Sequence, residues 1–490
     1  MVGTYLAALA VCVASLSIGQ AAISLCGVRR WSWLAPAVGL ALLCAICWAT
    51  VRLPGEGTVA AILVPLLVLA SVVYLGRRMP GGGAAWRIGM PVALGALAAA
   101  SLPFAVEGHF GILGTGFNPD MSQHLLATER LAAGTGGELM REGYPLGPHA
   151  IVVALEKGLG TGPVHGFSGL TVAVAILAPL TALAAFAGQP PARRTAAALL
   201  VGLPYLIASY FAQGAFKETI QALLILAFVL ALRESTRSWH DLPLRFAPAA
   251  LLAAGSVYVY SFPGLIWLGA VGVIWAVLEV VARRRGPSAG GGVVGGSVQA
   301  RRPVFRPTDS TSDTRSPGEK PSDRTDPPTT TTGPAATRAL FLALAVFLIG
   351  TLPELGRMID FKQFETFDPT GPGLGNLFGQ LSPFTALGTW PSGDLRVAPG
   401  DGAAPAILFY LGAAFATGLL LAGLARARRV GEHALLAGVA AVVAVYLAAR
   451  IGGTPYTAAK ALALAAPVLS LAIVLPLVAG TPGGWGGGGG

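Results

Sequence analysis

Residues 247–285 read APAALLAAGSVYVYSFPGLIWLGAVGVIWAVLEVVARRR. They contain two long apolar runs, near 247–263 and 264–282, separated only by the letters SFPG. A helix of about 20 apolar residues, rising about 1.5 Å per residue, crosses a hydrocarbon core of about 30 Å. Three arginines follow the second run, as is typical of the cytoplasmic end of a membrane span. This stretch therefore predicts two membrane-spanning helices joined by a tight turn.

Similar apolar runs recur along most of the 490 residues, of which 54% are hydrophobic and only 11% charged. A soluble domain carries about 25% charged residues, so the chain lacks the polar shell of a soluble globule. No alternating pattern of the kind found in outer-membrane barrels is present. We predict an all-α, polytopic bundle of about thirteen membrane spans. These spans lie near 3–26, 33–50, 58–76, 88–107, 164–187, 195–212, 219–233, 247–263, 264–282, 339–354, 403–424, 433–450 and 461–480.

A polar, low-complexity segment divides the bundle into two blocks. Its Gly, Ser, Thr and Pro content cannot bury enough apolar surface to offset the entropy of ordering, which predicts a disordered linker. The predicted parts are an N-terminal membrane block at 1–284 with a catalytic outer loop at 107–163, a disordered cytoplasmic linker at 285–338, a C-terminal membrane block at 339–480 with an outer loop at 354–402, and a Gly-rich tail at 481–490.

The positive charges predict the orientation in the membrane. The formal net charge is +10, and arginines such as Arg77, Arg193, Arg283 and Arg426 gather in alternate, mostly short loops. Basic loops remain in the cytoplasm, so we expect the N-terminus outside a cell membrane and both the linker and the C-terminus inside. These arginines orient the protein in the lipid bilayer, and this accounts for its high net positive charge. We therefore expect no nucleic-acid partner.

The outer loop at 107–163 concentrates ionisable side chains in an otherwise apolar chain. Asp120 and His124 are four residues apart, so they share a face if this segment forms an interfacial helix. Tyr144 and His149 follow in the letters YPLGPHA. Asp120 could instead merely cap a helix, and His124 could be only structural. The Asp120–His124 pair could also bind a divalent cation, although two ligands do not complete a metal site.

Two further outer segments carry cations close to the predicted bilayer surface. Lys217 and Glu218 stand between two spans, and Arg450, Tyr456 and Lys460 surround the start of the last one. Charges at this depth are costly unless they are paired or hydrated, which makes them candidates for binding a phosphate head group. The alternative is that these side chains only anchor helix ends at the interface.

The letters ATERLAAG after Asp120, and then YPLGPH, resemble the first extracytoplasmic loop of the GT-C superfamily of membrane glycosyltransferases. The superfamily includes protein O-mannosyltransferases and lipid A aminoarabinose transferases. The late PYTAAK is similar to a Tyr/Lys stretch that several members place near the donor phosphate. Met121 stands where many members have a second acid.

The resemblance implies a GT-C-like fold and an enzyme of the cell envelope. It would transfer a hexose or pentose from a polyprenyl-phosphate donor to a hydroxyl of a glycan, lipid or protein, with inversion. Asp120 would be the catalytic base. The substrate-binding residues would be His124, Tyr144, His149, Lys217, Glu218, Arg450, Tyr456 and Lys460. The alternatives are a lipid-linked polysaccharide polymerase or ligase with essential outer-loop arginines, a transporter or flippase of lipid-linked sugars, and an inactive assembly protein.

Overall fold

The structure is a computed structural model that describes residues 1–55, 57–78, 83–114, 120–135, 138–284, 333–361, 373–389, 394–402 and 404–478. Across these ranges the chain is helical and contains no strand. The Gly-rich tail at 481–490 and most of the predicted linker lie outside the described residues. The linker boundary at 338 is wrong, because the following helix already begins at Gly333.

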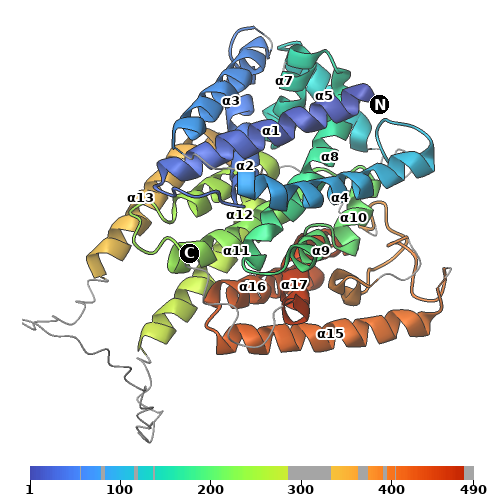
Figure 1. The fold of residues 1–490 in the computed structure, drawn as a ribbon. Coiled ribbons are helices and arrows are strands. Elements are labelled where there is room, and N and C mark those ends of the chain that lie inside the picture. Colours follow the sequence, from blue (N-terminus) through green and yellow to red (C-terminus); the bar gives the residue numbers. More distant parts are fainter. Residues whose placement is uncertain are drawn as a thin grey trace, which may run out of the picture.

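The N-terminal block contains most of the helices (Figure 1). Four of them precede the large outer loop: α1 (Val2–Leu25), α2 (Ala35–Val51), α3 (Thr58–Arg78) and α4 (Gly83–Glu107). The loop itself folds into α5 (Asp120–Ala132), α6 (Glu138–Arg141) and α7 (Gly147–Leu159). The block continues with α8 (Gly162–Ala182), the 3-10 turn η1 (Leu183–Phe186), α9 (Pro191–Gly202), α10 (Tyr205–Ala212), α11 (Lys217–Arg237) and α12 (Ala247–Arg284).

The C-terminal block packs against this first block and completes one continuous core. It consists of α13 (Gly333–Thr351), η2 (Leu352–Glu354), α14 (Leu355–Phe361), η3 (Pro383–Leu387), α15 (Ala406–Arg429), α16 (His433–Gly452) and α17 (Pro455–Val478). In Figure 1 the N-terminus lies on the right, whereas the ends of α12 and α13 that flank the linker lie on the left.

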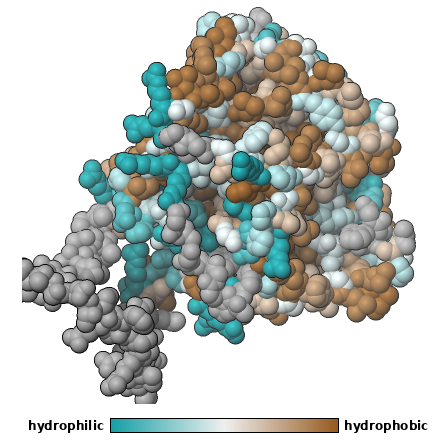
Figure 2. All heavy atoms as spheres, in the orientation of Figure 1, coloured by the Kyte–Doolittle hydropathy of each residue, from teal (hydrophilic) through white to brown (hydrophobic). Residues whose placement is uncertain are grey.

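The described residues contain the long apolar helices of a multi-pass membrane protein. By length and composition ten helices can cross a bilayer, or eleven if the bent pair α9–α10 forms one span. Apolar side chains cover much of the surface in Figure 2, and on α3 the residues Ile62, Leu66 and Leu69 are all more than half exposed. The predicted number of thirteen spans also includes the 17-residue α2 and divides α12 in two, so that number stays a prediction.

Helices α1 and α2 approach each other closely because small residues meet at their crossing. A Cβ atom added to Gly39 would collide with the backbone carbonyl of Ser15, and one added to Gly19 would collide with that of Ala35. Small residues allow this close backbone contact, which is the usual basis of helix association in membranes.

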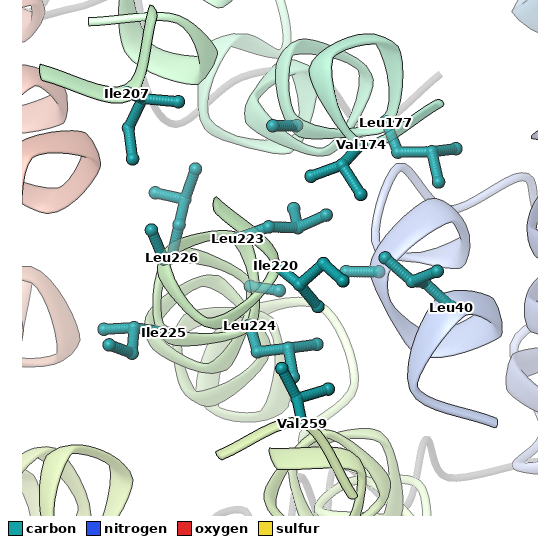
Figure 3. Packing of buried hydrophobic residues seen from close by; sticks show 14 of the residues in the cluster. Leu40, Val174, Leu177, Ile207, Ile220, Leu223, Leu224, Ile225, Leu226 and Val259 are labelled. Atoms are coloured by element: carbon teal, nitrogen blue, oxygen red, sulfur yellow. The ribbon is translucent and has the colours of Figure 1, made fainter. Parts of the chain in front are cut away.

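Helix α11 runs through the centre of the bundle and is buried on every side. Its residues Ile220 to Leu232 are all buried, and Figure 3 shows Ile220 and residues 223–226 packed among side chains of α8, α2, α10 and α12. A membrane helix without an exposed face is held by many neighbours at once. The charged residues at its two ends are therefore fixed relative to the rest of the molecule.

Helix α12 reverses direction at Ser261, as the letters SFPG predicted. Ser261 is a non-glycine residue with φ 55° and ψ −151°, a conformation that side chains rarely adopt. Gln221 Nε2 donates to the carbonyl of Gly264 at 3.3 Å, and Gln221 Oε1 accepts from Ser256 Oγ at 2.9 Å. Both legs of α12 therefore lie beside the same side chain of α11.

Helix α7 belongs to the predicted loop at 107–163 but packs inside the bundle. It contacts α2, α3 and α8, and the residues His149 to Val153 are buried. Its two charged residues stand in the last turn, so they leave the buried face apolar.

Candidate active site

One large cavity collects residues from segments that are far apart in the sequence. It has a volume of about 740 Å³ and lies where α5, α11 and α17 begin, beside the turn of α12. Pockets that bind small molecules typically measure about 300–1,000 Å³. Seven of the nine residues predicted for the site line it: Asp120, His124, Tyr144, Lys217, Glu218, Tyr456 and Lys460.

Glu218 and Lys460 form a buried ion pair across the cavity floor. Lys460 Nζ lies 3.0 Å from Glu218 Oε1 and 4.4 Å from the centre of the Tyr456 ring. The Tyr260 hydroxyl lies 3.4 Å from the same oxygen of Glu218. Because Glu218 belongs to the N-terminal block and Lys460 to the C-terminal block, this pair joins the two blocks at the cavity.

Lys217 has a different environment from its neighbour. Its ammonium group donates a hydrogen bond to the Tyr144 hydroxyl and lies 3.9 Å from the centre of that ring. Among the described residues no carboxylate forms an ion pair with Lys217, since Glu218 pairs with Lys460. Lys217 therefore presents an amino group at the cavity that is bound to a phenol and, within the described residues, not to a carboxylate.

The two histidines of the outer loop meet behind Tyr144. His149 Nε2 lies 3.1 Å from His124 Nδ1, and both rings pack against Phe216. Burial lowers the pKa of His149 to about 3. Burial, followed by the charges of nearby groups, holds the pKa of His124 well below its usual value. Both rings are consequently neutral at pH 7, and His149 supports the cavity wall from behind without lining it.

An arginine of the C-terminal block fixes the backbone of Tyr144. Arg357 donates to the carbonyl of Tyr144 at 2.5 Å and to that of Met140 at 2.9 Å. Its Nε lies 3.1 Å from Glu354, which also accepts a hydrogen bond from Trp48 Nε1 at 2.6 Å. Five donors on a rigid plane allow an arginine to hold several acceptors at once.

Gly143 allows this contact to form. It has φ +71°, and a Cβ atom at this position would collide with the carbonyl of Arg357. Only glycine adopts this conformation freely and leaves space for the second backbone. Gly143 thus lets the segment before Tyr144 lie directly against α14.

The cavity is polar on one side and apolar on the other. Asp120, the first residue of α5, is exposed at its rim. The opposite side is formed by apolar residues of the second leg of α12, of α16 and of α17, among them Ile266, Ala448 and Leu464. Ile266 is 53% exposed on the outside of the bundle, so this apolar wall adjoins the surface that faces lipid.

Arg450 does not join the other predicted residues. It lines a separate cavity of about 440 Å³ with residues 378–383, Thr385, 395–399 and Asp401. The reason is the helical rotation of about 100° per residue, which turns Arg450 away from the cavity that Ala449 lines.

Several lining residues were not anticipated from the sequence. Tyr260 and Phe262 come from the turn of α12, Tyr210 from the bent pair, and Asn376 from the second outer loop. Tyr260 directly precedes the letters SFPG and Phe262 is one of them, so that turn was a usable signal. Nothing in the sequence distinguishes Asn376 from other polar residues of its loop.

The described residues do not supply a protein-held metal site. No group of three or more His, Cys, Asp or Glu side chains lies close enough to hold a metal ion in the part of the chain that the structure describes. His124 faces His149. The predicted divalent cation therefore finds no complete ligand set here, and no step below is routed through one.

The fold and the cavity together define a helical membrane protein with a charged, lipid-adjoining pocket. Comparisons with family models, with curated proteins and with solved structures gave no match.

Proposed function

We propose that this chain is a membrane glycosyltransferase that takes its sugar from a polyprenyl-phosphate donor at the outer face of the cell membrane. One observation carries the proposal: Asp120, Lys217 and Lys460 come from three segments spread over more than 300 residues of the sequence and line one cavity. A base, a cation for a phosphate and an apolar wall for a prenyl chain are what this reaction needs in one place.

Lys217 is the best candidate to hold the donor phosphate. Lys460 is already neutralised by Glu218, whereas no described carboxylate pairs with Lys217. The starts of α11 and α17 also border the cavity, and the positive ends of helix dipoles favour anions. The cation would stabilise the charge that develops on the leaving phosphate, which is usually a large catalytic contribution.

Asp120 would act as general base. Its carboxylate accepts the proton of an acceptor hydroxyl while that oxygen attacks the anomeric carbon of the sugar. The bond between the anomeric carbon and the phosphate oxygen breaks, and polyprenyl phosphate leaves as an anion. Direct displacement inverts the anomeric centre. The polar rim suits the acceptor and the apolar wall of α12, α16 and α17 suits the prenyl chain.

The test uses a panel of radiolabelled polyprenyl-phosphate sugars, incubated with membranes or with the purified protein. We expect transfer of label from at least one donor to glycan, lipid or protein. Asp120→Asn should lower the rate by about 100-fold or more, the usual contribution of a general base. Asp241→Asn is the matched control, because Asp241 lies in another loop with its side chain 86% exposed. Full activity of Asp120→Asn at normal expression would refute the proposal.

A transporter or flippase of lipid-linked sugars is the second candidate, and broken helices favour it. Helices α9 and α10 meet at 58°, and α12 reverses beside the cavity, as in transporters with discontinuous helices. The charged residues, however, stand within the first two turns of α11 and α17 and not at mid-helix. Movement of a fluorescent donor across proteoliposomes, with no transfer of sugar, would favour this second function.

The outer-loop arginines give little support to a polymerase or ligase. Arg357 is bound to Glu354 and two carbonyl groups, and Arg396 is bound to Asp394 through both carboxylate oxygens. Arg450 is the one arginine among the nine predicted site residues. It has no described partner, and it lies outside the main cavity.

A further inference from the structure

The cavity that contains Arg450 is polar and open, and its side chains have hydrogen-bonding capacity to spare. Arg450, Asp401, Gln380 and Ser382 all line it. Within the described part of the chain none of these four side chains makes a hydrogen bond or ion pair with another residue. Unlike the Arg396–Asp394 pair beside them, these groups do not stabilise the loop.

Two elements of the chain border both cavities. Ala448 and Ala449 line the first cavity and the next residue, Arg450, lines the second. Asn376 lines the first cavity and Phe378, two residues later, lines the second. One turn of α16 and one loop segment therefore contribute to both sites.

The chemistry of the second cavity suits a polyhydroxylated, uncharged ligand. Arg450 only donates hydrogen bonds, Asp401 only accepts them, and Gln380 and Ser382 do both. A free anion would be repelled by Asp401 and a free cation by Arg450, whereas sugar hydroxyls satisfy both groups. The ring of Phe378 is 69% exposed, with the Arg396 guanidinium 4.6 Å from its centre. An exposed aromatic ring packs well against the apolar face of a sugar ring.

We propose that this second cavity binds a neutral saccharide, namely the acceptor glycan of the transferase. The assignment to an acceptor rests on the proposed function. The assignment of a saccharide site rests only on the residues that line this cavity. Among glycan, lipid and protein acceptors, the unpartnered donors and acceptors beside an exposed aromatic ring favour the glycan. Bound there, the acceptor presents its hydroxyl groups next to the donor cavity.

Binding of saccharides can be measured without any donor. Full-length protein, purified in detergent and labelled with a fluorophore, is applied to a printed array of neutral hexose and pentose oligosaccharides. The strongest binder is then titrated by calorimetry. We expect Arg450→Gln and Asp401→Asn each to weaken binding by about 10-fold or more, because each loses a hydrogen bond that involves a charge. Ser382→Ala, a smaller change, should weaken binding less.

Two controls separate this inference from the proposed function. Arg428→Gln removes an exposed arginine from the last turn of α15, outside both cavities, and should leave binding unchanged. Asp241→Asn, in an exposed loop outside both cavities, should leave binding unchanged as well. If the wild type transfers no sugar but binds saccharides through Arg450 and Asp401, the transferase proposal fails and the saccharide site stands.

The opposite outcomes would overturn the inference. Wild-type protein that binds no oligosaccharide on the array has no such site. Binding that is unchanged in both Arg450→Gln and Asp401→Asn, with melting temperatures equal to the wild type, would refute it as well. Sugar transfer that keeps the wild-type KM for the acceptor in both variants would leave the transferase standing and remove the acceptor site.

Discussion

Helix α11 carries charged side chains at both of its ends, and the two ends differ in what surrounds the charges. At its start, Lys217 and Glu218 line a cavity of about 740 Å³. At its end, Arg233 lies 3.1 Å and 3.2 Å from the two oxygens of Glu432, and Arg237 lies 3.1 Å from one of them. None of these three residues lines either of the two cavities described above.

The comparison shows how to distinguish a stabilising charge cluster from a functional one. Glu432 is only 3% exposed, and its two arginine partners saturate it. At the other end, no described carboxylate forms an ion pair with Lys217, whose amino group is bound to the Tyr144 hydroxyl. Both groups join the N-terminal block to the C-terminal block, so their positions in the fold are equivalent. What differs is the lack of a described ion-pair partner for Lys217 and the space beside it.

The largest effect on stability is expected at the saturated end. Glu432→Gln leaves Arg233 and Arg237 without their common partner, and breaking a buried pair costs about 3–5 kcal/mol. We expect the free energy of unfolding in detergent to fall by about 3 kcal/mol, with sugar transfer per folded molecule unchanged. Glu234→Gln is the control, because Glu234 makes one contact with Arg233, at 3.2 Å, and is 20% exposed. Equal melting of Glu432→Gln and the wild type would contradict a structural role.

An intermediate effect is expected at Arg357, which supports the cavity from outside it. Arg357→Lys keeps the charge but cannot hold Glu354 and two carbonyl groups together, so we expect a loss of about 2 kcal/mol. Because Tyr144 would no longer be fixed, donor KM should rise as well. Arg52→Lys is the control, since Arg52 makes one 3.3 Å ion pair with the same Glu354 and stacks on Trp48 but holds no backbone carbonyl of the cavity wall. A donor KM that stays constant would show that Arg357 only stabilises the fold.

The residues around α11 also show how much of the structure could be predicted from the sequence. Apolar runs and alternating basic loops predicted the helices and the grouping of the outer segments, because both depend on local composition. Seven of the nine predicted residues line one cavity because they belong to these grouped segments. Whether Lys460 or Lys217 is neutralised by Glu218 was not predictable, since it depends on how two blocks far apart in sequence pack together.

Arg450 and His149 show the same limit at the level of one helix turn. Position in the sequence placed both near the site, but helix rotation points Arg450 into the second cavity and His149 into the core. The ion pair between Glu354 and Arg357 was not predicted either, although their spacing of three residues permits it. Their partner Trp48 lies about 300 residues away and could not be deduced.

A smaller effect is expected from acid, and only at the cavity end. The folded-state pKa of His149 is about 3 and that of His124 is also lowered, whereas an unfolded histidine titrates near about 6.5. Below that pH the unfolded state binds more protons, so stability falls as pH falls, by at most about 1.4 kcal/mol per pH unit for each histidine. Melting temperatures between pH 7 and pH 5 should decline less steeply in His149→Phe. Identical slopes would show that His149 does not remain neutral in the fold.

The smallest effect on stability is expected for Lys217→Gln, and it decides the comparison. No described carboxylate loses a partner in this variant, and glutamine can still bond to the Tyr144 hydroxyl. The free energy of unfolding should therefore change by less than about 1 kcal/mol. The affinity for polyprenyl phosphate, measured as thermal stabilisation by the added lipid, should fall by about 10-fold or more, because a charge-assisted hydrogen bond is lost. Lys157→Gln, an exposed lysine in the last turn of α7, should alter neither quantity. If Lys217→Gln unfolds as readily as Glu432→Gln and still binds the lipid, both ends of α11 serve stability alone and the donor phosphate must be held elsewhere.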